Sequence, residues 1–211
     1  MGDANRPIGV VLAGGAGRRM GGGMSVVELH GTPLLAYPVA ALRIALGEVI
    51  VVAKRDTELP PLPGVPVWTE PEQPRHPLTG LVHALEQAGG RPILLAAGDL
   101  PFVSAALVRE LADSDPQGAP AVVPHVAGRL QPLLALYLPA AREPLSAALA
   151  RDGGPGRLSD VVAALSPRIL ELTAERPFFN VNVPEDLLTA AAMIDVGEAA
   201  PGDDAPSATN P

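Results

Sequence analysis

The chain has 211 residues, of which 47% are hydrophobic and 18% are charged, and its formal net charge is −8. This length suits one globular domain with a sizeable buried core. The acidic total argues against a general nucleic-acid-binding protein, although a local basic patch is compatible with it. Because cysteine is absent, disulfide bonds and thiolate metal sites are excluded.

The amino terminus lacks the pattern of a secretion signal. Its apolar run, residues 8–13, is too short for the core of a signal peptide and has an acidic residue upstream. No segment reaches the roughly 18 apolar residues that a membrane-spanning helix needs. We therefore expect a cytoplasmic protein without nucleic-acid or membrane partners, present as a monomer or a weak homo-oligomer.

Short apolar runs alternate along the chain with helix-like segments. Continuous β-branched runs bounded by Gly or Pro predict buried strands, at residues 8–13, 49–53, 66–68, 92–99, 121–124, 132–138 and 168–172. Apolar residues at helical spacing predict helices, at residues 38–46, 77–87, 104–113, 140–150, 158–164 and 185–194. Repeated strand–helix units predict an α/β fold with a doubly wound, mostly parallel sheet.

The last residues differ in composition from the rest of the chain. Residues 197–211 read GEAAPGDDAPSATNP and have no apolar periodicity, so they predict a disordered acidic tail behind a single domain of residues 1–196. Residues 195–211 carry four acidic side chains and no Lys or Arg, which is half of the net charge. The folded body is therefore only mildly acidic.

A glycine-rich loop, read in the segment LAGGAGRRMG, directly follows the first predicted strand. Gly14, Gly15 and Gly17 have no Cβ atoms, so the backbone can approach a phosphate and point N–H groups at it. Arg18 and Arg19 add charged, forked donors for phosphate oxygens. The loop is neither a Walker A sequence nor G-x-G-x-x-G, and a plain strand-to-helix turn explains the glycines equally well.

The residue sequence of this loop is more specific than its glycine content. It resembles the signature loop of the molybdenum cofactor guanylyltransferase family, the MobA-like NTP transferases, and more loosely that of sugar-1-phosphate nucleotidyltransferases. Five further segments resemble elements of the same family in the same order. They are HGTPLL at 30–35, HPLTGL at 76–81, GDLPF at 98–102, QPLLALY at 131–137 and NVNVPEDL at 180–187.

The resemblance implies a single-domain, three-layer, Rossmann-like nucleotidyltransferase fold. It also implies a Mg²⁺-dependent reaction in which GTP donates its nucleotidyl group to the phosphate of molybdopterin and pyrophosphate leaves. Asp99 takes the metal-binding and catalytic role, and Arg19 a second catalytic role. The residues expected to contact the nucleotide lie near the ends of the first three predicted strands, namely Leu12, Ala13, Gly14, Gly15, Gly17, Arg18, Met24, Lys54 and Glu70. Asn180 and Asn182 face the acceptor.

The residues themselves support some of these roles better than others. Asp99 ends a predicted buried strand, and a carboxylate is a hard ligand suited to Mg²⁺, although it could also cap a helix. Lys54 is equally compatible with an exposed lysine at a strand end. Glu70 stands where the family has Asp and can accept from guanine or ribose, or it is an exposed loop carboxylate. Guanine cannot be derived from spacing, so cytidylyl or other nucleotidyl transfer remains an alternative.

Two positions depart from the family pattern. The family loop runs R-M-G-x-x-K, and Met24 occupies the position of the phosphate-contacting lysine, where a thioether supplies no positive charge. His76 replaces a glycine and is expected to narrow the pocket. Three interpretations follow: Arg18, Arg19 or Lys54 replaces the missing charge, the protein binds a nucleotide or molybdopterin with weak catalysis, or Met24 is an engineered substitution.

Overall fold

The computed structural model describes residues 6–13 and 26–199. Its helices are α1 (Ala36–Leu46), α2 (Pro77–Gln87), α3 (Ala105–Asp113), α4 (Arg142–Leu149), α5 (Leu158–Ala163) and α6 (Pro184–Ala199). Its strands are β1 (Ile8–Leu12), β2 (Glu28–Leu29), β3 (Thr32–Pro33), β4 (Val49–Ala53), β5 (Val67–Thr69), β6 (Ile93–Ala97), β7 (Ala121–Val126), β8 (Arg129–Leu130), β9 (Leu134–Tyr137) and β10 (Arg168–Glu171). Short 3-10 helices, η3 (Pro139–Ala141) and η4 (Arg176–Phe178), complete this part of the chain.

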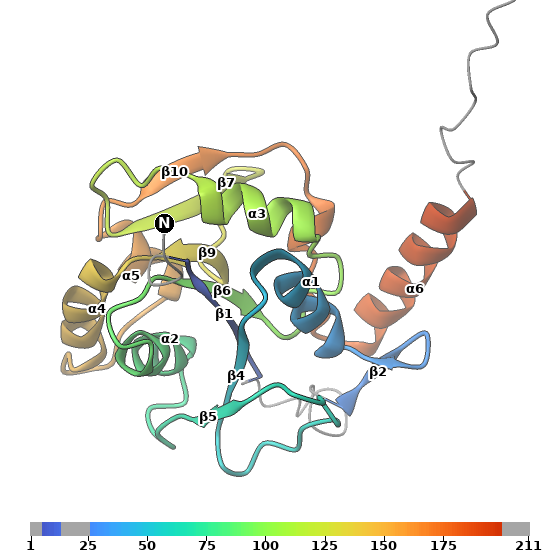
Figure 1. Ribbon diagram of the computed structural model, residues 1–211, viewed down its shortest axis with the longest axis horizontal. Coiled ribbons are helices and arrows are strands. Elements are labelled where there is room, and N and C mark those ends of the chain that lie inside the picture. Colours follow the sequence, from blue (N-terminus) through green and yellow to red (C-terminus); the bar gives the residue numbers. More distant parts are fainter. Residues whose placement is uncertain (1–5, 14–25, 200–211) are drawn as a thin grey trace, which may run out of the picture.

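In the described part of the chain, the main sheet has the strand order β10-β7-β9-β6-β1-β4-β5, with β8 paired to β7 (Figure 1). β1 is parallel to both β6 and β4, β5 is parallel to β4, and β10 is parallel to β7. β9 is antiparallel to β6 and β7, and β8 is antiparallel to β7. The predicted α/β fold is confirmed as a mixed sheet of mostly parallel strands.

The reversed strand β9 follows from the short connection that precedes it. The chain leaves β7 at Ala127 and Gly128, whose φ angles are 48° and 76°. These two residues form a tight turn between β7 and β8. Only a few residues then separate β7 from β9, whereas a parallel crossover needs a dozen or more. β9 therefore runs antiparallel to β7.

Helices cover both faces of the sheet and form the predicted three layers. One cluster of buried side chains joins the sheet to α2, α4 and α5, and a second cluster joins the opposite face to α1 and α3. Figure 1 shows these two helix groups on opposite sides of the strands. Every residue of β1, β4 and β6 is buried because both faces are covered, which explains their uninterrupted apolar sequences.

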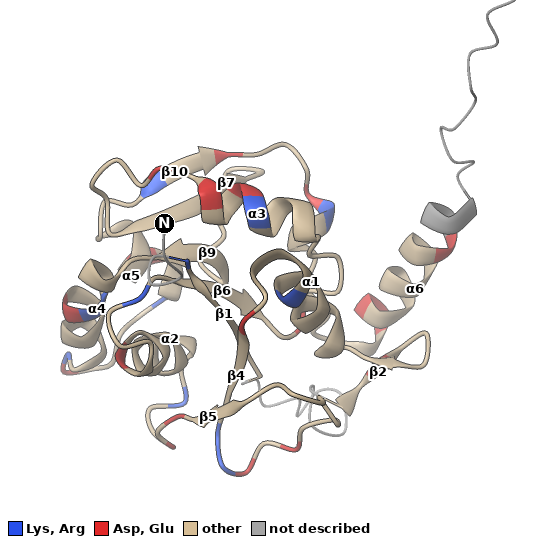
Figure 2. Cartoon of the chain, viewed as in Figure 1, with Lys and Arg blue, Asp and Glu red and all other residues tan. Residues whose placement is uncertain are grey.

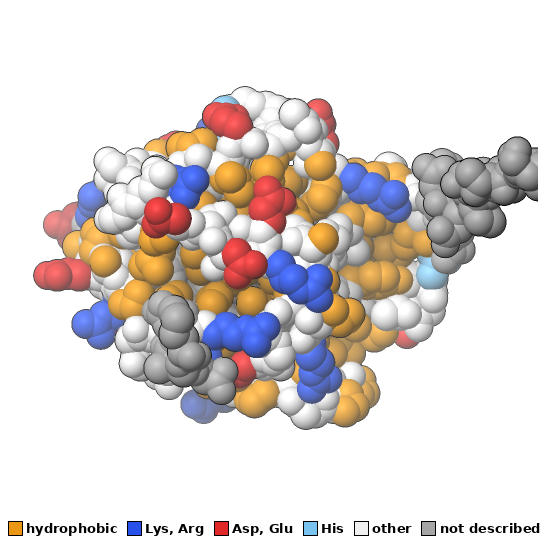
Figure 3. Space-filling model, turned by 45° about the horizontal axis from the view of Figure 1, so that its top comes forward, with side chains coloured by type: hydrophobic (Ala, Val, Ile, Leu, Met, Phe, Trp, Pro, Cys, Tyr) orange, Lys and Arg blue, Asp and Glu red, His pale blue; other side chains and the backbone are white. Residues whose placement is uncertain are grey.

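Charged residues lie mainly on the helices and connecting loops, and the central strands β1, β4 and β6 carry none (Figure 2). On the face drawn in Figure 3, acidic and basic side chains alternate among hydrophobic ones and form no large patch of one sign. Because the central strands are uncharged, any charge near the centre of the sheet must come from residues that follow these strands.

None of the helices within the described residues is long and apolar enough to cross a membrane.

The sheet has a topological switch point beside β1. After β1, the chain adds β4 and β5 on one side, and α2 then returns it to β6 on the other side of β1. The helices that follow β1 and β6, α1 and α3, pack together on one face of the sheet, whereas α2 packs on the other face. In open α/β sheets, ligands bind outside the carboxyl ends of the strands at such a switch point. Asp99 directly follows β6 and therefore lies at this edge of the sheet.

A small hairpin precedes α1, which the sequence did not predict. β2 and β3 pair through a turn at His30 and Gly31, whose φ angles are 51° and 72°. The segment HGTPLL therefore forms a turn and a strand, and α1 begins at Ala36 instead of residue 38. The strands have only two residues each, too few to produce a pattern of alternating hydrophobicity.

The last helix is longer than predicted. α6 covers Pro184–Ala199 instead of residues 185–194, so residues 197–199 of the predicted tail are helical. A single glycine costs a helix interior only about 1 kcal/mol, so Gly197 does not end the helix. Leu187, Ala190 and Ile194 pack beside Leu29 of the hairpin. Residues 200–211 lie outside the described residues, and the boundary between domain and tail stays a prediction.

Ser104 caps α3, and its hydroxyl accepts a hydrogen bond from the Leu107 amide at 3.2 Å. Ser104→Ala should lower the free energy of unfolding by about 1 kcal/mol, because this amide loses its partner. Urea denaturation measures the change. Ser114→Ala, at the other end of the same helix, is the control and should change stability by less than about 0.5 kcal/mol. Equal losses in both variants would contradict the capping role.

Candidate active site at the carboxyl edge of the sheet

The ends of β1 and β6 are held in close contact at the switch point. The Gly98 amide donates to the Leu12 carbonyl at 3.0 Å, and the Ala13 amide donates to the Val52 carbonyl at 2.9 Å. A Cβ on Gly98 would lie 2.7 Å from Leu35 Cδ1 and 3.0 Å from the Leu12 oxygen. Only glycine fits this position, and it places Asp99 directly beside the end of β1.

Asp99 presents a carboxylate oxygen that has no partner. Its Oδ1 is shielded from solvent and accepts no hydrogen bond from any residue that the structure describes. Burial raises the pKa of Asp99 to about 6. A shielded, unpaired carboxylate is costly unless a cation or donor joins it. The described residues contain no group of three His, Asp or Glu side chains able to hold a metal, and a carboxylate oxygen such as Asp99 Oδ1 is a hard ligand of the kind that Mg²⁺ prefers.

Lys54 and Glu70 form a nearly buried ion pair behind the ends of β4 and β5. Lys54 Nζ lies 3.2 Å from Glu70 Oε1, and the two side chains are 9% and 6% exposed. The same Nζ donates to the Pro71 carbonyl at 2.6 Å. Burial raises the pKa of the Glu70 carboxyl, and the positive charge of Lys54 opposes that shift. The exposed positions considered for both residues are therefore wrong, and Lys54 is already neutralised by a carboxylate.

The second oxygen of Glu70 is unsatisfied. Oε2 has no hydrogen-bond partner within the described residues, and a Cβ on Gly80 would lie 2.9 Å from it. The same Cβ would lie 2.9 Å from Leu12 Cδ2. Gly80 thus lets α2 pack against the end of β1 and against the Glu70 carboxylate without supplying a donor to Oε2. This part of the site offers one free acceptor beside a lysine ammonium.

The Asn-Val-Asn segment is attached directly to Asp99. The Val181 amide donates to the Asp99 carbonyl at 3.0 Å, and the Val181 side chain is fully buried. Successive residues of an extended segment alternate in direction, so Asn180 and Asn182 face away from the core and are exposed. Asp186 accepts from the Asn182 amide at 2.8 Å and fixes the start of α6. The backbone between Asn180 and Asn182 therefore lies against that of Asp99, and the contacts of the two amides with the acceptor stay a prediction.

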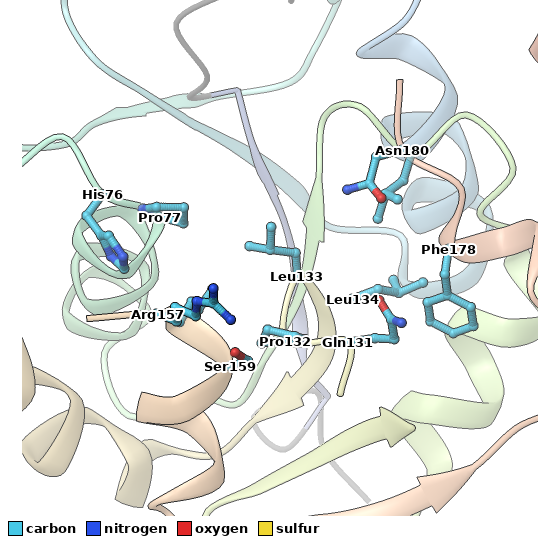
Figure 4. Close-up of a pocket in the computed structure, with 12 residues that line it drawn as sticks. His76, Pro77, Gln131, Pro132, Leu133, Leu134, Arg157, Ser159, Phe178 and Asn180 are labelled. Atoms are coloured by element: carbon cyan, nitrogen blue, oxygen red, sulfur yellow. The ribbon is translucent and has the colours of Figure 1, made fainter. Parts of the chain in front are cut away.

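A cavity of about 390 Å³ opens next to this segment (Figure 4). Figure 4 shows His76, Pro77 and Arg157 on one side and Asn180 and Phe178 on the other. Its remaining lining comes from β9 and the residues before it, the segment after β6, and the start of α5, namely Leu100, Gln131, Pro132, Leu133, Leu134, Leu158 and Ser159. A second cavity, of about 760 Å³, shares Asn180 with it and is also lined by Asn182.

Tyr137 is the last residue of the segment QPLLALY, residues 131–137, whose first residues line this cavity. It is completely buried in β9, and its hydroxyl donates to the Pro132 carbonyl at 2.7 Å. Burial raises the pKa of Tyr137 far above its ordinary value. The hydroxyl therefore remains a neutral donor that holds the Gln131–Pro132 turn against the sheet.

Several predicted site residues lie outside the described part of the chain. They are the members of the glycine-rich loop and the residue after it, Gly14, Gly15, Gly17, Arg18, Arg19 and Met24. Among the others, the structure brings Leu12, Ala13 and Asp99 together and places Lys54 and Glu70 on the adjacent strand ends. Sequence reasoning missed the cavity residues Arg157, Ser159 and Phe178. The glycine-rich segment before Arg157 was the signal that could have indicated a ligand loop.

Comparisons with known proteins bear on this arrangement. The sequence model of the MobA-like NTP transferase domain matches residues 9–169. The chain belongs to this family. The match begins within β1 and ends within β10, and it includes the glycine-rich loop, Asp99 and the Lys54–Glu70 pair, so the resemblance stated from short motifs is confirmed.

Two curated relatives extend the match over most of the chain. The molybdenum cofactor guanylyltransferase of Acidiphilium cryptum is 35% identical over 193 residues, which covers 87% of this chain and 93% of that protein. The protein of the same name from Mesorhizobium japonicum is 35% identical over 199 residues, covering 88% and 95%. The family member described here is thus similar over nearly its whole length to proteins named as nucleotidyltransferases.

Solved structures confirm the fold. Molybdopterin-guanine dinucleotide biosynthesis protein A from Archaeoglobus fulgidus superposes with a TM-score of 0.70 and 22% identity, covering 89% of this chain and 98% of that one. 2-C-methyl-D-erythritol 4-phosphate cytidylyltransferase from Thermus thermophilus gives a TM-score of 0.66 and 24% identity, covering 90% and 99%. At these identities the similarity concerns the fold alone.

Proposed function

We propose that this protein transfers the guanylyl group of GTP to the phosphate of molybdopterin and releases pyrophosphate. The observation that carries the proposal is the unpaired Asp99 carboxylate at the switch point, in a chain 35% identical to molybdenum cofactor guanylyltransferases. A phosphate oxygen of the acceptor attacks the α-phosphorus of GTP and forms a P–O bond. The bond from the α-phosphorus to the bridging oxygen breaks, and pyrophosphate leaves with the electron pair.

Positioning and charge neutralisation supply most of the catalysis in such a transfer. The triphosphate is proposed to bind the backbone amides of Gly14, Gly15 and Gly17, with Arg18 and Arg19 on its oxygens. Arg19 has the catalytic role among these residues. Leu12 and Ala13 position the nucleoside end of the loop because hydrogen bonds fix both residues to neighbouring strands.

Asp99 fits a Mg²⁺ ion, because its shielded Oδ1 is an unsatisfied hard oxygen ligand. When bound there, Mg²⁺ would neutralise negative charge on the triphosphate and stabilise the leaving pyrophosphate. The role of this chain is to hold Asp99 in place. Gly98 and the Val181 amide fix the backbone on both sides of the carboxylate.

Glu70 and Lys54 are proposed to bind the guanine base. The Watson–Crick edge of guanine presents two adjacent N–H donors and one carbonyl acceptor. Glu70 Oε2 is a buried acceptor without a hydrogen-bond partner among the described residues, and Lys54 Nζ is a donor 3.2 Å from the other oxygen of the same carboxylate. This order of acceptor and donor matches the guanine edge. The exposed amides of Asn180 and Asn182 are proposed to contact the acceptor.

A substrate panel tests this proposal. The protein is incubated with Mg²⁺, molybdopterin and one of GTP, CTP, ATP or UTP, and pyrophosphate release is followed. Release with GTP alone is the expected result. Release with CTP alone would replace guanylyl by cytidylyl transfer. Calorimetric binding of GTP without release would identify a nucleotide-binding protein that does not catalyse transfer.

Met24→Lys should raise the rate of transfer, because it restores a cation at the position where the family carries its phosphate-contacting lysine. We expect roughly a 10- to 100-fold increase in the initial rate of pyrophosphate release. Met20→Lys adds the same charge elsewhere in the loop and should have a smaller effect. An unchanged rate for Met24→Lys, together with high wild-type turnover, would show that the arginines already supply the charge.

A further inference from the structure

Among the described residues, the 390 Å³ cavity is lined by hydrogen-bond donors and a cation and by no carboxylate. Arg157, His76 and Ser159 lie along one wall, and the amides of Gln131 and Asn180 contribute to the other. None of its lining residues within the described part of the chain is Asp or Glu. The 760 Å³ cavity differs in this respect, because two acidic side chains line it. The smaller cavity therefore favours an anionic ligand by charge as well as by hydrogen bonding.

His76 presents one ring nitrogen to this ligand. Its Nδ1 accepts a hydrogen bond from the Leu78 amide at 3.1 Å, and its carbonyl accepts from the Thr79 amide at 2.9 Å. An acceptor Nδ1 carries no proton, so the ring proton is on Nε2. Pro77 has no amide proton, and the next two amides are already paired. The His76 side chain, rather than the backbone at the start of α2, must therefore donate to a ligand here.

Arg157 supplies the positive charge of the same wall. Its carbonyl accepts from the Asp160 and Val161 amides at 3.1 Å each, which fixes its backbone at the start of α5. Its guanidinium has no ion pair or hydrogen bond among the residues that the structure describes. Figure 4 shows this side chain near His76, above Pro132 and Ser159. A fixed backbone and an unpaired guanidinium are suited to clamping a phosphate.

We propose that His76 and Arg157 bind the phosphate of the acceptor, and that His76 is a specificity-determining residue of this chain. The inference rests on the proposed function, because it names the group that the acceptor cavity holds. Arg157 contributes charge, and His76 Nε2 contributes a directed hydrogen bond to one phosphate oxygen. Since the resembling family has glycine at position 76, this donor distinguishes the present chain. Leu133 and Phe178 provide apolar surface for the remainder of the acceptor.

Binding of inorganic phosphate tests the subsite without any turnover. The protein is labelled with ¹⁵N at histidine and saturated with Mg²⁺ and a GTP analogue that cannot be cleaved between the α- and β-phosphorus. Titrated phosphate should shift the His76 Nε2 resonance in a saturable way, and Arg157→Met should weaken that shift. His125, paired with Glu171 at 2.8 Å, is the internal reference and should not respond. No shift at His76, or equal shifts at both histidines, would overturn the proposal.

Kinetics of matched variants provide the second test. His76→Asn keeps an acceptor for the Leu78 amide, so α2 stays capped, but it loses the Nε2 donor. The KM for the acceptor should rise about three- to tenfold, because one hydrogen bond is lost, while the KM for GTP stays unchanged. His76→Asp also keeps the cap and should raise the acceptor KM further through charge repulsion. His125→Asn is the matched control and should behave as wild type.

The two proposals fail in different ways. If the wild-type protein releases no pyrophosphate from GTP and molybdopterin, the proposed function is wrong, and the phosphate titration still decides the subsite. If the wild-type protein is active but His76→Asn keeps the wild-type KM for the acceptor, the role of His76 is wrong. Thermal melting of both variants identifies a loss of folding, and in that case the His76 resonance of the wild-type protein gives the answer.

Discussion

Asp99→Asn should abolish guanylyl transfer and at the same time stabilise the metal-free protein. Transfer should fall by at least about 10³-fold, because the unpaired oxygen that would hold the metal loses its charge. The free energy of unfolding at pH 7.5 should rise by up to about 3 kcal/mol, since burial raises the pKa of Asp99 from 3.8 to about 6. Urea denaturation and pyrophosphate release measure the two effects.

The sign of the stability effect follows from proton linkage. Well below pH 3.8, the Asp99 carboxyl is protonated in both the folded and the unfolded protein. Its charge then has no effect on the free energy of unfolding. As pH rises from 3.8 to about 6, the unfolded chain releases its proton first, so wild-type stability falls. The advantage of Asp99→Asn should therefore grow over this range and stay constant above it.

Added Mg²⁺ provides the control for this prediction. It should raise the melting temperature of the wild-type protein when a GTP analogue is present, because a ligand that binds only the folded state stabilises it. The same addition should leave Asp99→Asn almost unchanged. Equal stabilisation of both proteins, or a less stable variant in the absence of metal, would contradict the role given to Asp99.

Lys54→Met should be the most destabilising single change at the site. The variant leaves the Glu70 carboxylate 6% exposed and without a counter-charge, which should lower the free energy of unfolding by about 3 kcal/mol at pH 7. Lowering the pH should reduce this loss, because burial already raises the pKa of Glu70 and a protonated carboxyl needs no partner. Urea denaturation at pH 7 and pH 5 measures both values.

Two further variants separate the buried pair from ordinary charge effects. The double variant Lys54→Met, Glu70→Gln removes both charges and should recover most of the lost stability. Arg75→Met breaks the exposed pair between Arg75 and Asp56, whose side chains are 45% and 59% exposed, and should change stability by less than about 1 kcal/mol. A double variant as unstable as Lys54→Met would show that packing, and not charge, dominates there.

The sequence predicts the centre of the sheet better than its edges. Residues 49–53 and 77–87 match β4 and α2 at both ends, because long apolar runs and helical spacing leave no competing interpretation. The β2–β3 hairpin was missed since its strands are too short to show a pattern. α6 was predicted too short because Gly197 was read as an end, although tertiary context tolerates a glycine within a helix.

The candidate site divides in a similar way. Asp99 was predicted from its place after a buried strand, since a strand end fixes where the next residue lies. The burial of Glu70 could not be predicted, because it depends on α2 packing closely through Gly80. Arg157 was missed for a related reason. It reaches the cavity only through the connection between α4 and α5, and no local pattern encodes such a long-range contact.

The single lysine of the chain takes on a different meaning in the structure. Lys54 is paired with Glu70 and with the Pro71 carbonyl, so it adds no net positive charge for a triphosphate. Lys54 therefore does not supply the unpaired positive charge that would replace the missing loop lysine. Phosphate binding is left to arginines, with Arg18 and Arg19 proposed at the nucleotide and Arg157 at the acceptor.

Labelled GTP tests the proposed transfer most directly. The protein is incubated with Mg²⁺, molybdopterin and GTP carrying ³²P at either the α- or the γ-phosphate, and the products are separated. We predict that the α-label appears in a molybdopterin dinucleotide and the γ-label in pyrophosphate. If the α-label stays in GTP or is released as GMP, with no labelled dinucleotide formed, this protein does not transfer the guanylyl group to molybdopterin.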